Sequence, residues 1–426
     1  MNAPTSHSMA PRRIAVIGSG IAGLTCAYLL NRRHDIQVFE ASDWIGGHTH
    51  TVDVQVEGRN YAIDTGFIVF NDWTYPNFIR LLGQVGVGFK PTEMSFSVSD
   101  PATGVEYNGH DLNTLFAQRS NLLSPAFWGM LRDILRFNRQ SLDDLANNRI
   151  SADTTLGQYL DNNGYGRRFI EHYIVPMGSA IWSMSLADML GFPLQFFVRF
   201  CKNHGLLSVS DRPTWQVIEG GSRSYVAPLT ASFAERIRLN CPVSRVVRDQ
   251  DGVTLHSAAG SERFDKVIFA CHSDQALALL DQPSEQERDI LGALPYANND
   301  VVLHTDTRLL PKRKLAWASW NYRLGGPTDQ PAAVTYNMNI LQGVEADTTF
   351  CVSLNQTAAI DPAKILARFQ YAHPQYSLAG IAAQARWEEL CGVQHTYYCG
   401  AYWANGFHED GVVSALRVAR AFGETL

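Results

Sequence analysis

The sequence predicts an α/β protein with two domains, a discontinuous Rossmann-type domain and an α+β domain that includes a mainly helical insertion. Three observations lead to this fold class. The chain has 426 residues, which exceeds one compact core. It opens with an apolar run, a glycine-rich turn and a helical stretch. Strand patterns then return after residue 210 and again at the end of the chain, on either side of helical stretches.

The first element is a βαβ motif. Residues 14–17 form a continuous apolar run, as expected for a parallel strand buried on both faces. A helix is predicted over residues 21–30 and a second strand over residues 36–39, and the two strands should pair. Arg12 and Arg13 before an apolar stretch also match a twin-arginine export signal. The fixed glycine spacing favours the first unit of the fold instead.

Helical periodicity dominates the next part of the chain. It covers residues 127–147, 156–160, 167–174 and 186–202, and we predict a mainly helical insertion there. The run around residues 192–200 is strongly apolar. It is a candidate for transient contact with a membrane surface, and a buried helix explains it equally well.

The second half of the chain returns to strands. Residues 243–247 and 253–256 predict a hairpin around Asp251-Gly252. Further strands are predicted over residues 266–270, 300–306 and 396–399, followed by a final helix over residues 411–422. These elements divide the chain into a Rossmann-type domain and a second domain. The first would hold residues 12–75, 210–275 and 385–426, and the second would hold residues 76–209 and 276–384.

Composition limits the function classes. Hydrophobic residues make up 46% and charged residues 18%, with a net charge of −6, so we expect no binding to nucleic acid. The 7 cysteines are dispersed without metal-ligand spacing, which indicates reduced thiols and a cytoplasmic protein, either free or peripheral to the inner membrane. No apolar run reaches the roughly 20 residues of a membrane-spanning helix.

The glycine turn carries the clearest chemistry. Gly18, Gly20 and Gly23 match GxGxxG, in which the first glycine allows the turn and the second lets a pyrophosphate approach the backbone. The third glycine lets the helix pack on the strand, and the helix N-terminus faces the phosphates. Glu40 ends the next strand, where a carboxylate accepts hydrogen bonds from ribose hydroxyls. The sequence therefore predicts a dinucleotide site.

Three further segments accompany this turn. Residues 44–49 hold a double glycine, residues 64–67 read Asp-Thr-Gly-Phe, and residues 399–411 join the last strand to the last helix. Together they resemble the flavin amine oxidase superfamily, which also includes phytoene desaturases, protoporphyrinogen oxidases and polyenoic fatty acid isomerases. The resemblance covers nearly the whole chain.

The resemblance implies FAD as the cofactor. The double glycine would follow the phosphates and ribityl chain, Gly66-Phe67 would lie near the isoalloxazine, and Val243 would meet the adenine. The last helix would direct its N-terminus at the flavin pyrimidine. The residues expected to bind FAD are therefore Gly18, Ser19, Gly20, Ile21, Ala22, Gly23, Glu40, Ala41, Gly46, Gly47, His48, Thr49, Thr65, Gly66, Phe67, Val243, Gly400, Ala401, Gly411 and Val412.

Several polar residues near these segments have two interpretations. His408 either lies beside the flavin or belongs, with Asp410, to an acidic helix start. His48 and His50, if on a strand, would present both rings to one face as metal ligands do, but no third ligand is near in sequence, so we predict no metal. Cys399 is expected to be a buried thiol rather than a covalent flavin link.

The sequence is less informative about the substrate. By the resemblance, residues 111–205 and 276–384 cover the flavin and form a substrate cavity. The sequence identifies no catalytic base. The residues that are candidates to line the cavity are His304, Trp320, Asn321, Tyr336, Asn339 and His408, although an aromatic residue at any one of these positions is more often core.

One departure from the family bears on the reaction. Many amine oxidases of the superfamily keep a lysine on a strand near flavin N5, and the matching strand, residues 300–306, has none. Residues 317–339 and 400–414 resemble a bacterial branch linked with fatty-acyl or lipid modification. We therefore expect dehydrogenation or desaturation of a lipid-like substrate. The alternatives are an amine oxidase that releases hydrogen peroxide and a flavin-dependent double-bond isomerase. The sequence does not predict an oligomeric state.

Overall fold

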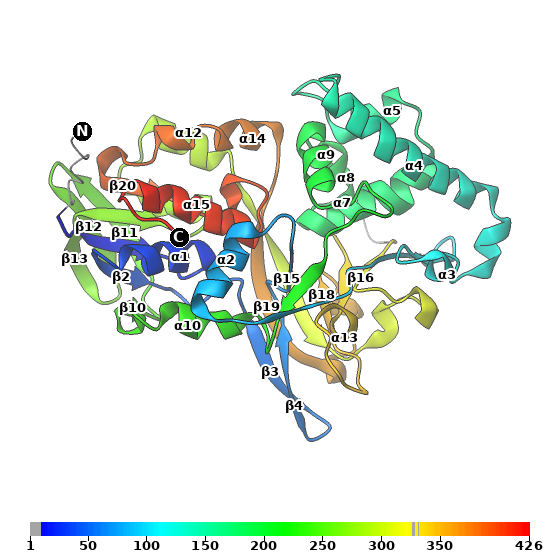
Figure 1. Ribbon diagram of the computed structural model, residues 1–426, viewed down its shortest axis with the longest axis horizontal. Coiled ribbons are helices and arrows are strands. Elements are labelled where there is room, and N and C mark those ends of the chain that lie inside the picture. The colour runs from blue at the N-terminus through cyan, green and yellow to red at the C-terminus, as the bar shows by residue number, and fades with distance from the viewer. Residues whose placement is uncertain (1–9, 326–328, 331) are drawn as a thin grey trace, which may run out of the picture.

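The structure, a computed structural model, describes residues 10–325, 329–330 and 332–426. Figure 1 shows a unit built on a parallel sheet on the left, and a helical layer above a larger mixed sheet on the right. The two parts meet beside strands β15 (Tyr296–His304) and β19 (Ile365–Pro374) in the centre of the view. This arrangement confirms the predicted α/β class.

The parallel sheet draws its strands from three distant parts of the chain. In sheet order they are β10 (Ile237–Arg238), β2 (Asp35–Phe39), β1 (Arg13–Ile17), β14 (Lys266–Phe269) and β20 (Thr396–Tyr398). The predicted βαβ motif is confirmed: β1 pairs in parallel with β2, and helix α1 (Ile21–Leu30) connects them. The side chains of β1 are buried after its first residue, as expected for a central parallel strand.

Helices from both ends of the chain pack together on this sheet. α1 lies beside the last helix, α15 (His408–Arg420), and a Cβ on Gly411 would lie only 2.8 Å from Ile21 Cγ2. α2 (Pro76–Val85) and α12 (Glu285–Gly292) contribute to the same core, although the sequence placed both in the second domain. Their buried apolar faces explain this position.

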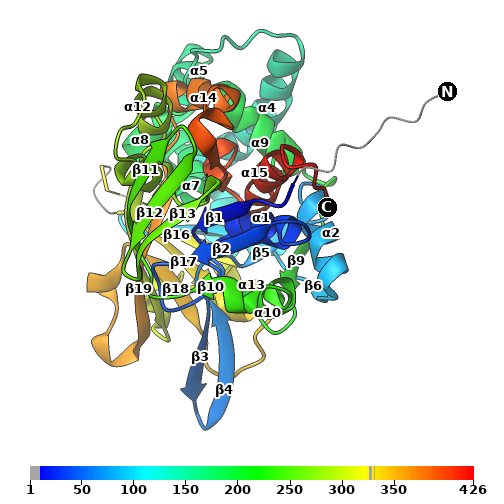
Figure 2. The same ribbon diagram turned by 90° about the vertical axis from the view of Figure 1, so that its left-hand side faces the viewer.

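A three-stranded antiparallel sheet packs against the parallel-sheet unit (Figure 2). It consists of β11 (Val243–Asp249), β12 (Gly252–Ser257) and β13 (Gly260–Phe264). The predicted hairpin is confirmed, because Asp249 pairs with Gly252 across the turn.

The helical layer has its own aromatic core. Its helices are α3 (Leu112–Leu115), α4 (Pro125–Ala146), α5 (Leu156–Asn162), α6 (Arg167–Phe169), α7 (Val175–Trp182), α8 (Leu186–Leu190) and α9 (Leu194–Asn203). The single helix predicted over residues 186–202 was wrong, because the chain breaks between α8 and α9 at Pro193, which caps α9. Phe192 and Phe197 are fully buried, so the buried-helix interpretation of this run is confirmed.

A seven-stranded sheet lies below the helical layer. Its order is β19, β15, β18 (Cys351–Leu354), β17 (Val334–Asn337), β16 (Trp320–Arg323), β7 (Phe96–Asp100) and β8 (Val105–Asn108). The remaining strands form a hairpin and a small sheet: β3 (Thr51–Val56) with β4 (Arg59–Asp64), and β5 (Val69–Asn71) with β9 (Trp215–Ile218) and β6 (Phe89–Pro91). Four short helices are α10 (Val226–Thr230), α11 (Ser273–Leu279), α13 (Met338–Leu341) and α14 (Leu378–Gln384).

Candidate flavin-binding site

The turn between β1 and α1 is shaped by three glycines with different roles. Gly18 has a φ of +105°, and a Cβ there would lie 2.8 Å from Ala270 O. A Cβ on Gly23 would lie 2.0 Å from Gly18 O. Gly20 is open, because a Cβ there would meet no atom of the described chain within 4 Å. Among the described residues α1 has neither a side-chain cap nor an acidic first turn, so its N–H groups can bind an anion. The turn therefore fits a pyrophosphate.

Glu40 faces this turn from the end of β2. Its carboxylate accepts hydrogen bonds from Ser19 N (2.9 Å), Ser19 Oγ (2.6 Å) and Ser42 N (2.8 Å). Cys241 N donates to Glu40 O at 2.9 Å, two residues before β11 begins at Val243. This position suits an acceptor for ribose hydroxyls, and it brings the start of β11 to the same end of the turn.

The double glycine folds across the first turn. Gly46 forms a parallel bridge with Gly20, and its N–H donates to Ser19 Oγ at 3.2 Å. A Cβ on Gly47 would lie 3.2 Å from Gly20 Cα. Both glycines have positive φ, +127° for Gly46 and +59° for Gly47. The backbone of this loop, with Ala41 just before it, thus lies against the turn that would hold the phosphates.

Two segments pair beside the double glycine. Phe67 N donates to His48 O at 2.7 Å, and Thr65 N donates to His50 O at 2.9 Å. Glycine is required at position 66, because a Cβ on Gly66 would lie 2.2 Å from His48 O. This close approach fixes the backbone that the sequence analysis placed near the isoalloxazine.

The chain end approaches the same region. β20 leads through Gly400 and Ala401 into α15, and Gly400 N donates to Ser414 Oγ at 2.8 Å. A Cβ on Gly400 would lie 2.4 Å from the Tyr402 ring, and Val412 is fully buried. Because α15 packs on α1, the N-termini of two helices converge on one region, as binding of a long anionic cofactor requires.

His408 is a buried anchor between these segments. Its Nε2 lies 3.0 Å from Thr49 Oγ1 and 3.3 Å from Tyr225 OH. Its ring stacks on Phe67 with centroids 3.5 Å apart. Burial holds the pKa of His408 well below its usual value, so the ring is neutral. Its contacts connect α15 to Thr49 and to Phe67, both in segments expected to bind FAD.

A group of histidine and tyrosine side chains lies where the parallel-sheet unit meets the seven-stranded sheet. This histidine–tyrosine cluster consists of His48, His272 and Tyr402 from the first and Tyr296, Tyr371 and His373 from the second. The His48 ring centroid lies 5.3 Å from that of Tyr371 and 5.6 Å from that of His373. Thr65 Oγ1 also contacts Tyr371 OH at 2.9 Å, which connects the cluster to the flavin-binding segments.

The cluster is uncharged at neutral pH. Burial lowers the pKa of His48 and of His272 to about 4, and the pKa of His373 to about 3. Within the described residues, His48 Nε2 and Tyr402 OH are buried without a hydrogen-bond partner. Buried polar atoms normally have a hydrogen-bond partner, so these two atoms are free to bond to a ligand. The donor set thus fits a cofactor or substrate between the two units.

The structure does not place His48 and His50 on a strand, the arrangement in which both rings would share one face. β3 begins only at Thr51, and both histidines precede it in a loop. The His48 ring belongs to the cluster, whereas the His50 ring stacks on Trp44 with centroids 4.6 Å apart. His50 Nδ1 also contacts Tyr371 OH at 2.7 Å. The two rings thus share Tyr371 as a neighbour and otherwise contact different residues.

Three of the candidate cavity residues have their polar groups used inside the fold. His304 is fully buried, and its ring contacts Ser353 Oγ at 2.8 Å and Asp306 N at 3.0 Å. The Asn321 amide bonds to neighbouring strands, and the Asn339 amide bonds to the loop that precedes β18. These contacts make the three side chains structural.

Trp320 and Tyr336 remain candidates to line a substrate site. They lie opposite each other on β16 and β17, with ring centroids 5.0 Å apart. Both are partly exposed, and Trp320 Nε1 has no hydrogen-bond partner among the described residues.

Cys399 is a fully buried free thiol with its sulfur 3.8 Å from that of Cys26.

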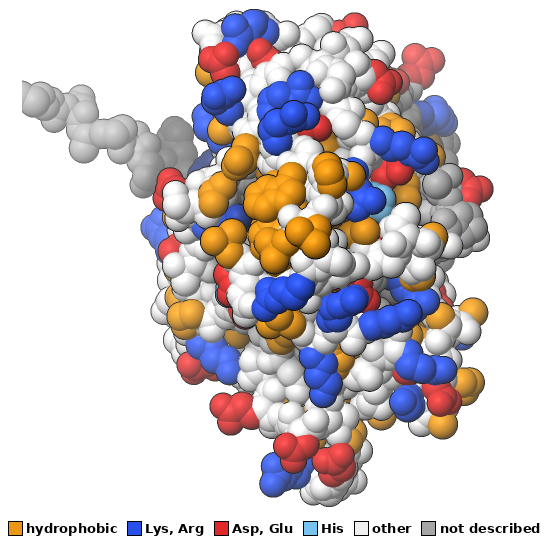
Figure 3. Space-filling model, turned by 90° about the vertical axis from the view of Figure 1, so that its right-hand side faces the viewer, with side chains coloured by type: hydrophobic (Ala, Val, Ile, Leu, Met, Phe, Trp, Pro, Cys, Tyr) orange, Lys and Arg blue, Asp and Glu red, His pale blue; other side chains and the backbone are white. Residues whose placement is uncertain are grey.

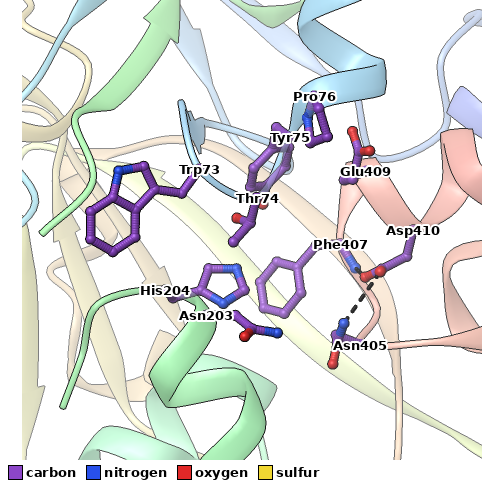
Figure 4. Close-up of a pocket in the computed structure, with 10 residues that line it drawn as sticks. All are labelled: Trp73, Thr74, Tyr75, Pro76, Asn203, His204, Asn405, Phe407, Glu409 and Asp410. Carbon is purple, nitrogen blue, oxygen red and sulfur yellow. Dashed lines mark hydrogen bonds between the residues drawn. The ribbon is translucent and has the colours of Figure 1, made fainter.

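A separate cavity of about 380 Å³ opens at the N-terminus of α15. The histidine–tyrosine cluster lies outside this cavity, and the cavity walls come from residues 73–76, 203–204, 405, 407 and 409–410. In Figure 4 the His204 and Phe407 rings lie side by side, and Asn405 Nδ2 is bonded to Asp410 Oδ1. Burial raises the pKa of Asp410 to about 6.

Of the six members of the histidine–tyrosine cluster, His48 alone was predicted as a site residue. His272 follows β14 at the carboxyl end of a parallel strand, a position where such sheets bind ligands. This position could have identified His272 as a site residue from the sequence. Tyr371 and His373 alternate on β19 and face the same side, but the sequence does not show that this side meets His48.

The parallel sheet, the glycine turn and the second helix N-terminus define a dinucleotide-binding protein of the α/β class. Solved structures share this fold over nearly the whole chain. Putrescine oxidase bound to putrescine is 15% identical with a TM-score of 0.69, and covers 96% of this chain and 98% of its own. A fatty acid isomerase from P. acnes that produces CLA is 16% identical with a TM-score of 0.67, over 96% and 98% of the two chains.

A sequence model described as flavin containing amine oxidoreductase matches residues 21–349. The chain belongs to this family. A 1-hydroxycarotenoid 3,4-desaturase of Flavobacterium sp. (strain P99-3) is 32% identical over 101 residues, 24% of this chain and 19% of that protein. A zeta-carotene desaturase of Solanum lycopersicum is 35% identical over 82 residues, 19% of this chain and 13% of that protein. The matched stretches thus span less than a fifth of these relatives.

Proposed function

We propose that the protein binds FAD and dehydrogenates or desaturates a hydrophobic, fatty-acyl or lipid-like substrate. FAD, when bound, supplies the acceptor for a hydride. The open position at Gly20 and the uncapped N-terminus of α1 support binding of its pyrophosphate. Glu40 would accept hydrogen bonds from the ribose hydroxyls, and the start of α15 would face the flavin ring.

The uncharged histidine–tyrosine cluster is the main observation that supports the proposed substrate class. Its three imidazoles are neutral at pH 7, and none of its six members is a lysine or a carboxylate. β15, which provides Tyr296, also lacks a lysine along its whole length. A site of this kind can bind an uncharged carbon chain at little cost. A cationic amine bound there would be a buried charge without a partner, which is unfavourable.

Contacts from two sides hold one ring of the cluster in place. His373 Nδ1 contacts Ser183 Oγ at 3.0 Å and Asn299 Nδ2 at 3.2 Å, so its ring is held from both the helical layer and β15. A fixed, uncharged wall would keep a donor carbon in one orientation, which hydride transfer needs. The local sequence similarity to two proteins named as desaturases supports the same reaction class.

The test is anaerobic reduction of the FAD-loaded protein. We expect the flavin band to bleach with acyl lipids and to stay unchanged with putrescine as the amine probe. A Gly20→Val variant, which fills the open position at the phosphates, provides the flavin-free control. A colourless protein that cannot be loaded with FAD would overturn the cofactor assignment.

Three other results assign a different reaction. Bleaching by putrescine but not by lipid, with hydrogen peroxide after oxygen is admitted, would make the protein an amine oxidase. Lipid double bonds that move without lasting bleaching would make it an isomerase. A His373→Asn variant that reacts with lipid at the wild-type rate would remove the cluster from the substrate site.

A further inference from the structure

We propose that one end of the molecule docks on an anionic lipid surface. The end is formed by α3, the 3-10 turns η1 (Arg119–Leu123) and η6 (Lys314–Ala316), and the first turns of α4. This proposal does not depend on the proposed function, although a lipid-like substrate would be reached from such a surface. Within the described residues, no helix is both long and apolar enough to cross a bilayer, so contact would be peripheral.

Large apolar side chains gather on this end. Leu123 is 87% exposed and Leu112 is 76% exposed, and Leu122, Trp128 and Leu315 are also exposed. Figure 3 shows this gathering of hydrophobic side chains, with Lys and Arg side chains above and below it. The docking face consists of Leu112, Leu122, Leu123, Trp128 and Leu315 together with the cationic side chains that surround them. A contiguous exposed group of this kind marks an interaction site.

The apolar side chains are held in place by the fold. Trp128 Nε1 donates to Leu122 O at 2.9 Å, and the Trp128 ring lies 5.4 Å from the buried Phe116 ring. Arg119 Nη1 donates to Phe116 O at 2.9 Å, which closes the turn that presents Leu122 and Leu123. η6 packs beside α3, so Leu315 joins the same surface as Leu112. The exposed side chains therefore project from a surface whose backbone is held by hydrogen bonds and packing.

Positive charge surrounds this apolar group although the chain as a whole has a net charge of −6. The exposed cationic residues are Arg119, Arg132, Lys312, Arg313 and Lys314. Within the described residues, Arg119, Lys312 and Lys314 make no ion pair with a carboxylate, whereas Arg313 pairs with Glu106 at 2.9 Å. Asp111, an exposed carboxylate of this stretch, is engaged as the cap of α3, and the exposed Glu93 lies 3.9 Å from His110 Nδ1.

The position of the residues on α4 continues the pattern. Trp128, Arg132 and Leu135 follow at intervals of four and three residues, so they share one face of the helix, and all three are exposed. Alternating apolar and basic side chains on an exposed helix face suit the boundary between headgroups and acyl chains.

A second copy of the chain fits this face poorly. In a twofold contact the same patch meets itself, which would bring the unpaired Lys312, Lys314 and Arg119 toward like charges. An anionic bilayer offers the opposite charge to the cationic side chains and an apolar layer to the leucines and the tryptophan. Charge complementarity therefore favours the lipid surface.

The test is co-sedimentation of the FAD-loaded full chain with vesicles of phosphatidylcholine alone or with phosphatidylglycerol added. We expect stronger binding to the anionic vesicles, weakened by salt. A Leu122→Ser/Leu123→Ser variant should lose most binding. A Lys312→Gln/Lys314→Gln variant should bind the anionic vesicles about 25-fold more weakly, roughly fivefold for each cation removed. The matched control is Arg59→Gln/Arg80→Gln, two exposed cations on other elements, which should bind as the wild type does.

Equal binding of all variants, or equal binding to both kinds of vesicle, would overturn the proposal. A dimer in solution that Leu122→Ser/Leu123→Ser dissociates, without vesicle binding, would assign the face to self-association instead. Vesicle binding by a protein whose flavin no lipid reduces would retain the docking face and reject lipid oxidation. Flavin reduction by dispersed lipid without vesicle binding would retain lipid oxidation and reject the docking face. The two proposals can therefore be rejected independently.

Discussion

Among the three glycines of the first turn, Gly20 alone leaves room for a side chain in the described structure. Its φ of −67° also suits any residue. We therefore predict that Gly20→Val folds with nearly wild-type stability and loses at least about 100-fold in FAD affinity, because each lost phosphate contact costs about 1.5–3 kcal/mol. Isothermal titration with FAD measures the affinity, and thermal unfolding of the apoprotein measures the stability.

Gly18→Val is the matched comparison. Gly18 has a φ of +105°, and a Cβ there would lie 2.8 Å from Ala270 O, so this variant should unfold at a lower temperature even without cofactor. If Gly20→Val binds FAD as tightly as the wild type does, the phosphates are not held at this turn.

His204 gives the protein a predictable pH dependence. Burial lowers the pKa of His204 to about 4, while its Nδ1 contact to Phe200 O at 3.0 Å opposes that shift. Between pH 6.5 and about 4, His204 binds a proton in the unfolded chain but stays neutral in the folded chain. Stability present above pH 6.5 is therefore lost as the pH falls, by up to about 1.4 kcal/mol per pH unit.

His204→Gln should remove this contribution. We expect the fall in the urea midpoint between pH 7 and pH 4.5 to be smaller in the variant than in the wild type. His110→Gln, at an exposed imidazole, serves as the control and should follow the wild-type curve. Identical curves for all three proteins would show that His204 is accessible to protons in the folded state.

Residues differ in how far the sequence predicted them. Gly18, Gly20 and Gly23 were recognised because a turn, its strand and its helix are contiguous. His373 was not, because its partner His48 is more than 300 positions away in the sequence and meets it only through β19. Asn321 was named as a candidate, yet its amide serves the sheet, which the residue type alone does not reveal.

At the scale of elements, α2 and α15 are joined by one buried carboxylate. Glu409 accepts hydrogen bonds from Asn77 N (3.1 Å) and Phe78 N (2.8 Å) in the first turn of α2. It also accepts one from Asn77 Nδ2 at 2.6 Å. Because Glu409→Ala leaves these donors unpaired, it should destabilise the protein by about 2–3 kcal/mol. Urea unfolding followed by tryptophan fluorescence measures the loss.

Two variants make that test specific. Glu409→Gln keeps an acceptor oxygen without the charge and should fall between the wild type and the alanine variant. Glu388→Ala, at an exposed carboxylate, should leave the midpoint unchanged. If Glu409→Ala matches Glu388→Ala, the cap of α2 contributes nothing to stability.

Elements were predicted well where one local pattern sets both ends. α1 begins after the glycine turn and ends at Leu30, as expected from the sequence. The helix predicted over residues 186–202 failed because a continuous apolar face conceals the break at Pro193. Residues 285–292 form a helix that the sequence placed with the second domain, since helical periodicity shows a buried face but not the sheet it meets.

At the scale of the whole molecule, the candidate flavin site is assembled from parts of the chain that are far apart. Residues 18–23, 40–49, 65–67 and 400–412 meet at the helix N-termini. Each of these segments alone is a common pattern, and only the fold brings them together. A cofactor that contacts all of them would stabilise the folded chain by about 2.7 kcal/mol at a concentration 100 times its Kd.

Hydrogen exchange tests this assembly directly. Addition of FAD should slow amide exchange in all four segments together, because one long molecule contacts them at once and suppresses their local opening. α4 (Pro125–Ala146), in the helical layer, should exchange at the same rate with and without FAD. Protection confined to residues 18–23 would mean that the nucleotide binds at the turn without reaching α15. Loss of all protection in Gly20→Val, with α4 unchanged, would tie the four segments to one bound cofactor.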